Sequence, residues 1–301
     1  RRVTDRSVRP FVAADSPAVL ELELANYDDT PMPGVSRAEI PWLISRMAIV
    51  EDGTVVALED DRIVGQCTPR ADALTVHPAF RRRGHGRRLV DAARTLVARE
   101  GLSELSLWGD ASRPSAAGFI AALGFTYRSS MWQFALPADR AVPAPVFPAD
   151  VVVRTVRPGI DDAPYVALIN RVFEDHPSPL SWSEAFIRSI HARPDFDPAG
   201  VLLVAPAAEP DRFIGVCRTL SLPGDDGQQR GEIGIVGLIP DWRGRGLGRQ
   251  LVRWGVGYLR SVGHDEVELS VEARNARALD LYTAEGFAAV VEWPHWVVPA
   301  T

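Results

Sequence analysis

The chain has 301 residues, enough for two domains of about 150 residues each, and its 46% hydrophobic and 24% charged residues are ordinary for a globular protein. The net charge of −6 argues against a broad nucleic-acid-binding face, and no apolar run approaches the ~18 residues of a membrane span. With two cysteines, Cys67 and Cys217, and no signal-peptide core, we expect a cytoplasmic protein without nucleic-acid or membrane partners.

The beginning of the chain alternates short strands and helices. A helix is predicted after Asp15-Ser16-Pro17, and β-rich runs follow at 55–58 and 63–67. An Arg/Gly-rich loop at 81–87 precedes a helix whose apolar residues form one buried stripe: Leu89, Ala93, Leu96 and Val97. Residues 105–107 then alternate as a strand does.

Residues 137–150 contain four prolines and no helical periodicity, which is typical of an extended linker. We therefore predict a first domain at 1–136, this linker, and a second domain at 151–301.

The second domain repeats the order of the first. The capping-box spacing of Ser181 and Glu184 predicts a helix at about 182–191, and β-rich runs follow at 201–204 and 213–217. The two cysteines lie 150 residues apart, whereas the two Arg/Gly loops lie 162 residues apart. The second domain therefore contains 12 additional residues between these points, and we place them in a longer hairpin tip at 223–229. A second helical stripe then contains Leu251, Val252, Gly255, Val256 and Leu259.

The repeat is clearest where residues 76–86, VHPAFRRRGHG, return as residues 238–248, LIPDWRGRGLG. In each copy a strand runs through a proline into glycines that open a helix, a pattern that can leave backbone N–H groups free to bind a phosphate. A P-loop would need Gly-Lys-Ser/Thr, which neither copy has, and a dinucleotide fingerprint would need glycine where Arg87 and Arg249 stand. The predicted anion-binding residues are Arg81, Arg82, Arg83, Gly84, His85, Gly86 and Arg87 in the first copy, and Arg243, Gly244, Arg245, Gly246, Leu247, Gly248 and Arg249 in the second.

Residues 275–287, NARALDLYTAEGF, decide the family together with the Arg/Gly loop. The two motifs resemble the GCN5-related N-acetyltransferase (GNAT) family. The paired arrangement, with His176-Pro177 and residues 196–200, FDPAG, ahead of the second sheet, is similar to the tandem, mycothiol-synthase-like branch. The resemblance implies an α/β (α+β) fold of two tandem GNAT-like domains, each a mixed, mostly antiparallel sheet flanked by helices. Hairpin and crossover connections in the predicted element order agree with a mixed sheet.

The resemblance also implies roles for individual residues, with acetyl-CoA as co-substrate and no metal. Main-chain groups of Val236, Gly237 and Leu238, and Leu74 and Val76 in the first copy, would align the pantetheine, flanked by Asn275 and Ala278. Tyr282 would protonate the departing thiolate, although it could instead be a half-buried packing residue. Glu232 would assist deprotonation of the amine, although it could instead be a solvated strand end.

The first domain departs from the family where the chemistry would occur. Ile120 stands in place of Tyr282, Arg113 in place of Asn275 and Arg70 in place of Glu232, with Asp72 as a partial acidic substitute. We therefore expect the first domain to bind acyl-CoA weakly or not at all and to do no chemistry.

Three functions remain open from the sequence. We favour transfer of an acetyl group from acetyl-CoA to a primary amine of a small molecule, by direct attack in a ternary complex. The alternatives are a non-catalytic acyl-CoA sensor and an acetyltransferase for protein N-termini or lysines. An aminoglycoside-like amine and an amino-sugar conjugate are both candidate acceptors. The sequence does not specify the oligomeric state. The resemblance places His176 and Trp182 where the acceptor would bind, although both are expected in surface loops, and Trp293, His295 and Trp296 are expected in the core.

Overall fold

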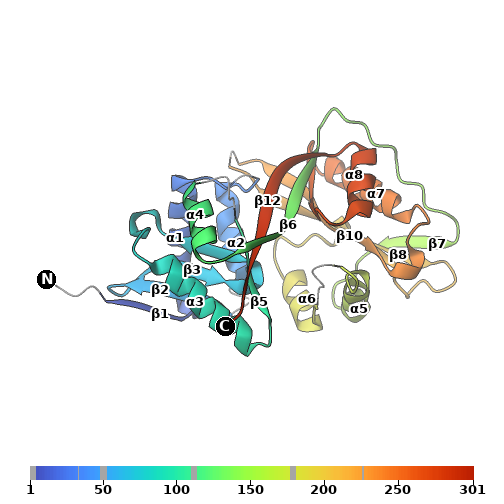
Figure 1. The fold of residues 1–301 in the computed structure, drawn as a ribbon. Coiled ribbons are helices and arrows are strands. Elements are labelled where there is room, and N and C mark those ends of the chain that lie inside the picture. Colours follow the sequence, from blue (N-terminus) through green and yellow to red (C-terminus); the bar gives the residue numbers. More distant parts are fainter. Residues whose placement is uncertain (1–4, 33, 48–52, 110–113, 177–180, 226) are drawn as a thin grey trace.

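The computed structural model describes all residues except 1–4, 33, 48–52, 110–113, 177–180 and 226. The described strands form one sheet of four strands and one of eight (Figure 1). The smaller sheet is antiparallel, with order β1-β2-β3-β4, and consists of β1 (Arg6–Pro10), β2 (Val55–Glu59), β3 (Arg62–Thr68) and β4 (Ala73–Val76).

The larger sheet has the order β5-β12-β6-β11-β10-β9-β8-β7. Among the described pairs only β10 and β11 are parallel, so the expected mixed, mostly antiparallel architecture is confirmed. Its strands are β5 (Glu104–Trp108), β6 (Thr126–Leu136), β7 (Val151–Thr155), β8 (Val201–Pro206), β9 (Gly215–Pro223), β10 (Gln229–Leu238), β11 (Val267–Glu272) and β12 (Ala288–Pro299).

The two halves of the chain, residues 5–136 and 151–301, exchange their last strands. β6 ends the first half but pairs with β11 of the second, from Met131 to Leu136. β12 ends the second half, yet its residues His295–Pro299 pair with β5 of the first. β6 and β12 also pair with each other, and Figure 1 shows them running side by side from one half into the other. Each half therefore supplies a strand that pairs with strands of the other within the eight-stranded sheet, a connection that the predicted division at 137–150 did not include.

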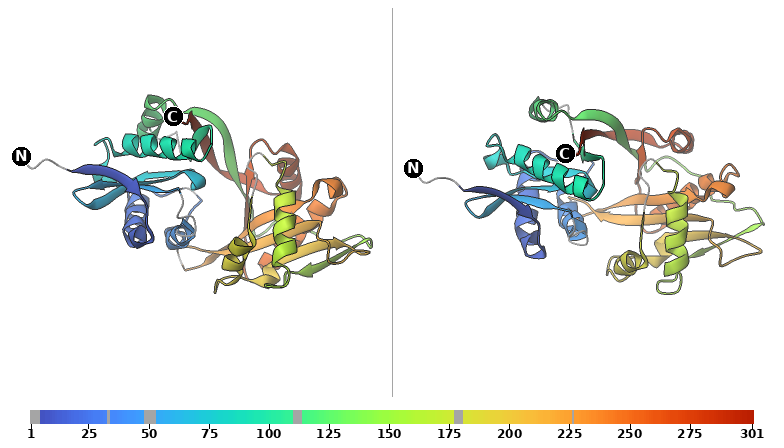
Figure 2. Two further views of the ribbon diagram at one scale, coloured as in Figure 1. Left: turned by 90° about the horizontal axis from the view of Figure 1, so that it is seen from below. Right: turned by 60° about the horizontal axis from the view of Figure 1, so that its bottom comes forward.

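The helices cover both faces of the sheets. Figure 2 shows α3 on one face of the smaller sheet and α1 and α2 on the other. The predicted stripes are confirmed, because Leu89, Ala93, Leu251 and Val252 are fully buried. The helices are α1 (Ser16–Asp29), α2 (Ile40–Met47), α3 (His85–Arg99), α4 (Pro114–Ala122), α5 (Asp162–Val172), α6 (Glu184–His191), α7 (Leu247–Ser261) and α8 (Ala276–Glu285).

The N-cap of α6 differs from the prediction. Ser183, not Ser181, caps the helix, and its hydroxyl accepts a hydrogen bond from the Phe186 N–H. Ser181 and Ser183 both precede helix formers, so the spacing of Ser181 and Glu184 selected the wrong serine.

The hairpin between β9 and β10 reaches the first half, and its tip lies where the insertion was predicted. The Ser36 hydroxyl donates to the Pro223 carbonyl at 2.6 Å, and the Ala38 N–H donates to Asp225 Oδ1 at 3.1 Å. Arg230, on β10, pairs with Glu39 of the first half and with Glu268 of β11. The inserted residues thus hold the second half against the loop between α1 and α2.

Residues 137–150 contain no helix or strand. Arg260 of α7 donates hydrogen bonds to the carbonyls of Pro137 and Arg140, and the Val146 N–H donates to Gln250. Within the described residues no helix is both long and apolar enough to span a bilayer.

Candidate active site

The second Arg/Gly loop, residues 243–249, forms the turn into α7. Gly244 and Gly246 have φ of +81° and +80°, a region that side-chain-bearing residues rarely adopt. Gly246 is the N-cap of α7, and no side chain caps this end. The first N–H groups of α7 are therefore available to an anion, with the helix dipole behind them.

The first Arg/Gly loop, residues 81–87, has the same backbone shape. Gly84 has φ +89° and is the uncapped N-cap of α3, and Arg82 takes the place of Gly244 with φ +63°. The same backbone geometry therefore occurs at the start of both helices, and phosphate binding by either loop stays a prediction.

The leading arginine of each loop has a structural role that the sequence did not indicate. Arg243 donates to the carbonyls of Leu238 and Val172 and pairs with Asp175 of the segment after α5. Arg81 repeats this arrangement in the first half, donating to the Val76 carbonyl and pairing with Asp29. Both guanidinium groups hold the loop against the helix that precedes it. Their hydrogen bonds are therefore made to protein groups and not to a phosphate.

Other loop arginines are also engaged. Arg245 lies over the Trp242 ring, 4.3 Å from its centroid, and Arg83 lies over Phe80 in the first half. Arg249 pairs with Glu285 at 3.0 Å but stays 48% exposed. Arg245 and Arg249 therefore keep accessible positive charge beside the start of α7.

The predicted anion contact of the His85 side chain is wrong. The residue is 1% exposed, and its Nε2 lies 2.8 Å from Glu59 Oε2. His85 corresponds to Leu247, which is also 1% exposed, because the first helical residue of each repeat packs inward. Only the backbone of His85 remains part of the cradle.

β10 and β11 separate next to the second loop. They pair from Gly231 to Ile233, and β10 then bulges at Gly234 and continues to Leu238 beside β9 alone. Bulges bend a strand and end its pairing, and they are common beside active sites. The edge of Val236, Gly237 and Leu238 that faces away from β9 is thereby free of ladder hydrogen bonds within the described strands.

Glu232 lies on β10 at the point where this separation begins. It is half-buried and lines a cavity of about 1670 Å³. A Cβ added at Gly234 would lie 3.8 Å from its carboxylate, so Glu232 faces the bulge. Glu232 is thus partly shielded from solvent, and its role in deprotonation of the amine stays a prediction.

Arg218 is a site residue that sequence reasoning missed. It lies on β9 and lines the same cavity, yet it is only 8% exposed. Burial lowers the pKa of its guanidinium, against the opposing charges of Glu232 and Asp195. No hydrogen bond or salt bridge to the guanidinium occurs within the described residues. A buried arginine without a protein acceptor must find one in a ligand or in water. The signal was a charged residue inside the apolar run GVCRTL.

Tyr282 lies in α8, is 7% exposed and packs 6.1 Å from the Phe287 ring. Burial raises the pKa of its phenol, so the group stays protonated at neutral pH. Asn275 caps α8, with Oδ1 accepting from the Ala278 N–H at 3.2 Å. The cap positions Tyr282 through the helix, and the predicted contacts of Asn275 and Ala278 with a cofactor stay predictions.

The cavity is shared by the two halves. From the second half it is lined by Glu232, Arg218, Tyr258 and Trp182, and from the first by β4 and the first Arg/Gly loop. Trp182 was expected on the surface, but its ring packs against Phe186 at this cavity. Neither Tyr282 nor the second Arg/Gly loop belongs to the lining. The described residues contain no group of three or more His, Cys, Asp or Glu arranged to hold a metal ion.

Comparison with known proteins identifies both repeats. Residues 166–287 match a model described as "Acetyltransferase (GNAT) family", and residues 51–127 match one described as "Acetyltransferase (GNAT) domain". A protein named mycothiol acetyltransferase from Thermobispora bispora is 38% identical over 219 residues, which cover 73% of this chain and 72% of that protein. A protein of the same name from Cellulomonas flavigena is 31% identical over 300 residues, covering 94% and 85%.

Solved structures agree on the fold. A GCN5-related N-acetyltransferase from Sphaerobacter thermophilus superposes with a TM-score of 0.67 at 25% identity, covering 98% of this chain and 96% of that one. A tandem GNAT protein from the clavulanic acid biosynthesis pathway gives 0.69 at 21% identity, with 99% of both chains covered.

Proposed function

The chain belongs to the GNAT acetyltransferase family, and we propose that it transfers the acetyl group of acetyl-CoA to the primary amine of a small amino-sugar conjugate. It is an N-acetyltransferase with a small-molecule acceptor. The observation that carries the reaction is Glu232, a carboxylate at the cavity, on the strand that parts from β11 and leads to the uncapped start of α7.

Acetyl-CoA would bind along this path. The N–H groups of the first turn of α7 fit a pyrophosphate, because no side chain caps them and Gly246 leaves the approach open. Arg245 and Arg249 add positive charge, while Arg243 keeps the loop in shape through Asp175. The free edge of Val236 and Leu238 would hydrogen-bond the pantetheine and align the thioester.

From ammonium ion to amide the nitrogen loses two protons, and the departing thiolate gains one. An ammonium ion cannot attack a thioester, so Glu232 would accept the first proton, directly or through water. The neutral nitrogen then bonds to the carbonyl carbon as the carbon–sulfur bond breaks, and its second proton leaves to water as the amide forms. Tyr282 would give its proton to the departing thiolate, and its raised pKa keeps that proton in place beforehand.

Arg218 would orient the acceptor. Its unpartnered guanidinium beside Glu232 offers up to five N–H donors to hydroxyl or carbonyl oxygens of the molecule that carries the amine. Its positive charge also favours the neutral form of a nearby amine. The name of the two relatives above, mycothiol acetyltransferase, supports an amino-sugar conjugate as acceptor. We propose that the reaction takes place in the cytoplasm.

The first half would contribute structure rather than chemistry. Ile120 stands where the second half has Tyr282, and Arg70 where it has Glu232. We propose that this half, residues 1–136, binds acyl-CoA weakly or not at all, and that residues 151–301 form the catalytic half.

Two measurements test the proposal. Calorimetric titration of acetyl-CoA into the full chain should give one site, whereas two sites would mean that the first Arg/Gly loop also binds. Thiol release from acetyl-CoA should depend on an added amino-sugar conjugate, and Glu232→Gln should lower kcat by about 10²-fold. Binding without turnover on any amine would favour a sensor, and no binding would refute the proposal.

A further inference from the structure

The shared cavity continues into the first half, where a carboxylate faces it without a basic partner. Glu23, on α1, accepts hydrogen bonds from Gln66 Nε2 at 3.0 Å and from Thr75 Oγ1 at 3.1 Å. Both donors are neutral, and within the described residues no arginine, lysine or histidine pairs with this carboxylate. Burial raises the pKa of Glu23, against the lowering effect of the two hydrogen bonds.

The second half shows that the fold does not need a carboxylate here. Asp29 and Asp175 hold the equivalent arginines Arg81 and Arg243, and counting back six residues from each places Glu23 opposite Ile169. Ile169 is fully buried in the apolar core. The two donors to Glu23 are also replaced, since Gln66 corresponds to Val216 and Thr75 to Gly237.

Glu23, Gln66 and Thr75 therefore form a polar cluster that the first half has and the second half lacks. Burying an ionised carboxylate costs several kcal/mol unless its environment compensates. Two neutral hydrogen bonds fill only part of the capacity of a carboxylate, which accepts at about four positions. A cationic ligand in the cavity would supply the missing compensation.

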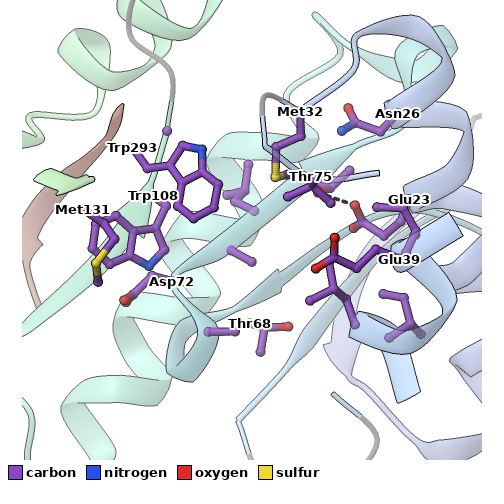
Figure 3. A pocket seen from close by; sticks show the side chains of 18 of the residues that line it. Glu23, Asn26, Met32, Glu39, Thr68, Asp72, Thr75, Trp108, Met131 and Trp293 are labelled. Carbon is purple, nitrogen blue, oxygen red and sulfur yellow. Dashed lines mark hydrogen bonds between the residues drawn. The ribbon is translucent and has the colours of Figure 1, made fainter. Parts of the chain in front are cut away.

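The opposite wall is aromatic. Figure 3 shows the carboxylates of Glu23 and Glu39 directed toward the side of the cavity that holds Trp108, Met131 and Trp293. One face of Trp108 is covered by His295, stacked at 4.1 Å, which leaves the other face for the cavity. Trp293 was expected in the core but lines the cavity instead.

The charges of the residues around Glu23 limit the kinds of ligand that can bind in this part of the cavity. Glu39 is already paired with Arg230, whereas Glu23 has no basic partner among the described residues and adds uncompensated negative charge to this wall. An anion would be repelled at this place, and an uncharged apolar molecule would leave the carboxylate uncompensated. A small molecule with an ammonium group and an apolar part suits both walls, because the ammonium group forms charge-assisted hydrogen bonds with a carboxylate and the apolar part packs on the indole rings.

We propose that the first half carries a binding site for the primary ammonium group of a small molecule, with Glu23 as counter-ion and Trp108 and Trp293 as the aromatic wall. The site is separate from Glu232 and needs no acetyl-CoA. Its ligand is either a second molecule of the acceptor or a different amine, and both would use the same ammonium chemistry.

Calorimetry with 2-phenylethylammonium, in the absence of acetyl-CoA, tests the site. The uncharged 2-phenylethanol, which has a similar shape, is the control ligand. Full-length protein should bind the ammonium compound at least about 10-fold more tightly than the alcohol, and Glu23→Gln should weaken ammonium binding by roughly 10- to 100-fold. Equal binding of the two compounds, or an unchanged affinity in Glu23→Gln, would overturn the proposal.

Glu232→Gln is the matched control in the second half. It should leave this binding unchanged, and loss of binding in that variant would place the probe in the acceptor site and refute the assignment. Glu23→Gln keeps the shape of the side chain, and its thermal transition will show whether it folds. If it does not fold, Trp293→Leu must weaken ammonium binding, or the aromatic wall is wrong. None of these measurements uses acetyl transfer, so their failure is distinct from failure of the proposed function.

Discussion

Replacement of Arg218 by methionine should stabilise the free protein and impair the enzyme. Methionine has a similar length but no charge. Because Arg218 is 8% exposed as a residue and its guanidinium has no protein acceptor among the described residues, the charged group carries a desolvation penalty. Removing it is worth about 1–3 kcal/mol, which would raise the Tm by about 2–6 °C in a chain of this size. The loss of a charge-assisted hydrogen bond to the acceptor should lower kcat/KM for that substrate by about 10- to 100-fold.

Arg230→Met is the matched control. Arg230 is also an arginine on a strand of the larger sheet, but it pairs with both Glu39 and Glu268. Its removal leaves two buried carboxylates unpaired and should destabilise the protein by about 3 kcal/mol or more. Calorimetric or optical melts of the two variants, with kinetics over a range of acceptor concentrations, make the comparison. If Arg218→Met lowers the Tm as Arg230→Met does, Arg218 is a structural partner and the reasoning is refuted. A stabilised variant with unchanged kcat/KM would show that Arg218 does not contact the acceptor.

Three further changes address other parts of the molecule. Tyr282→Phe should lower kcat by about 10²-fold with an unchanged dissociation constant for acetyl-CoA, and unchanged turnover would remove the acid role. Gly246→Asp puts a carboxylate and a strained positive φ into the second Arg/Gly loop, so calorimetry should detect no acetyl-CoA binding; normal binding would mean that the cradle lies elsewhere. Asp161→Asn should cost about 3 kcal/mol at pH 7, because Arg154 and Arg157 hold the pKa of this carboxyl well below its usual range. A lowered pKa stabilises above the unfolded value of about 3.9, so in urea titrations the deficit should shrink as the pH falls below about 4; a deficit independent of pH would contradict the linkage.

The parts of the fold set by local pattern were predictable. The buried stripes of α3 and α7 follow from apolar spacing, and the positive φ of Gly84 and Gly246 follows from glycine placement before a helix. The family match then followed from motifs that are close in sequence.

Features that depend on distant partners were not predictable. β6 and β12 are the last strands of two similar repeats, and the sequence of neither strand indicates the repeat with whose strands it pairs. Arg243 was predicted to bind phosphate because the local sequence does not show its partner Asp175, which lies 68 residues away. His85 was predicted to bind an anion because its partner Glu59 is also distant in the sequence. The sequence did not indicate the importance of Glu23 and Arg218. It depends on the absence of an oppositely charged protein partner among the described residues, which only the packed structure shows.

The strand exchange has a consequence for synthesis on the ribosome. The edge of β5 is complete after Trp108, but its partner residues begin at His295. At the usual 5–20 residues per second, the nascent chain waits roughly 10 to 40 s before that partner is made. During this time the first half exposes an unpaired apolar edge, and β6 has neither of its neighbours until β11 is made. The enzyme should therefore depend on chaperones until its final residues emerge, and a ribosome stalled before residue 295 should present an aggregation-prone intermediate rather than a finished first domain.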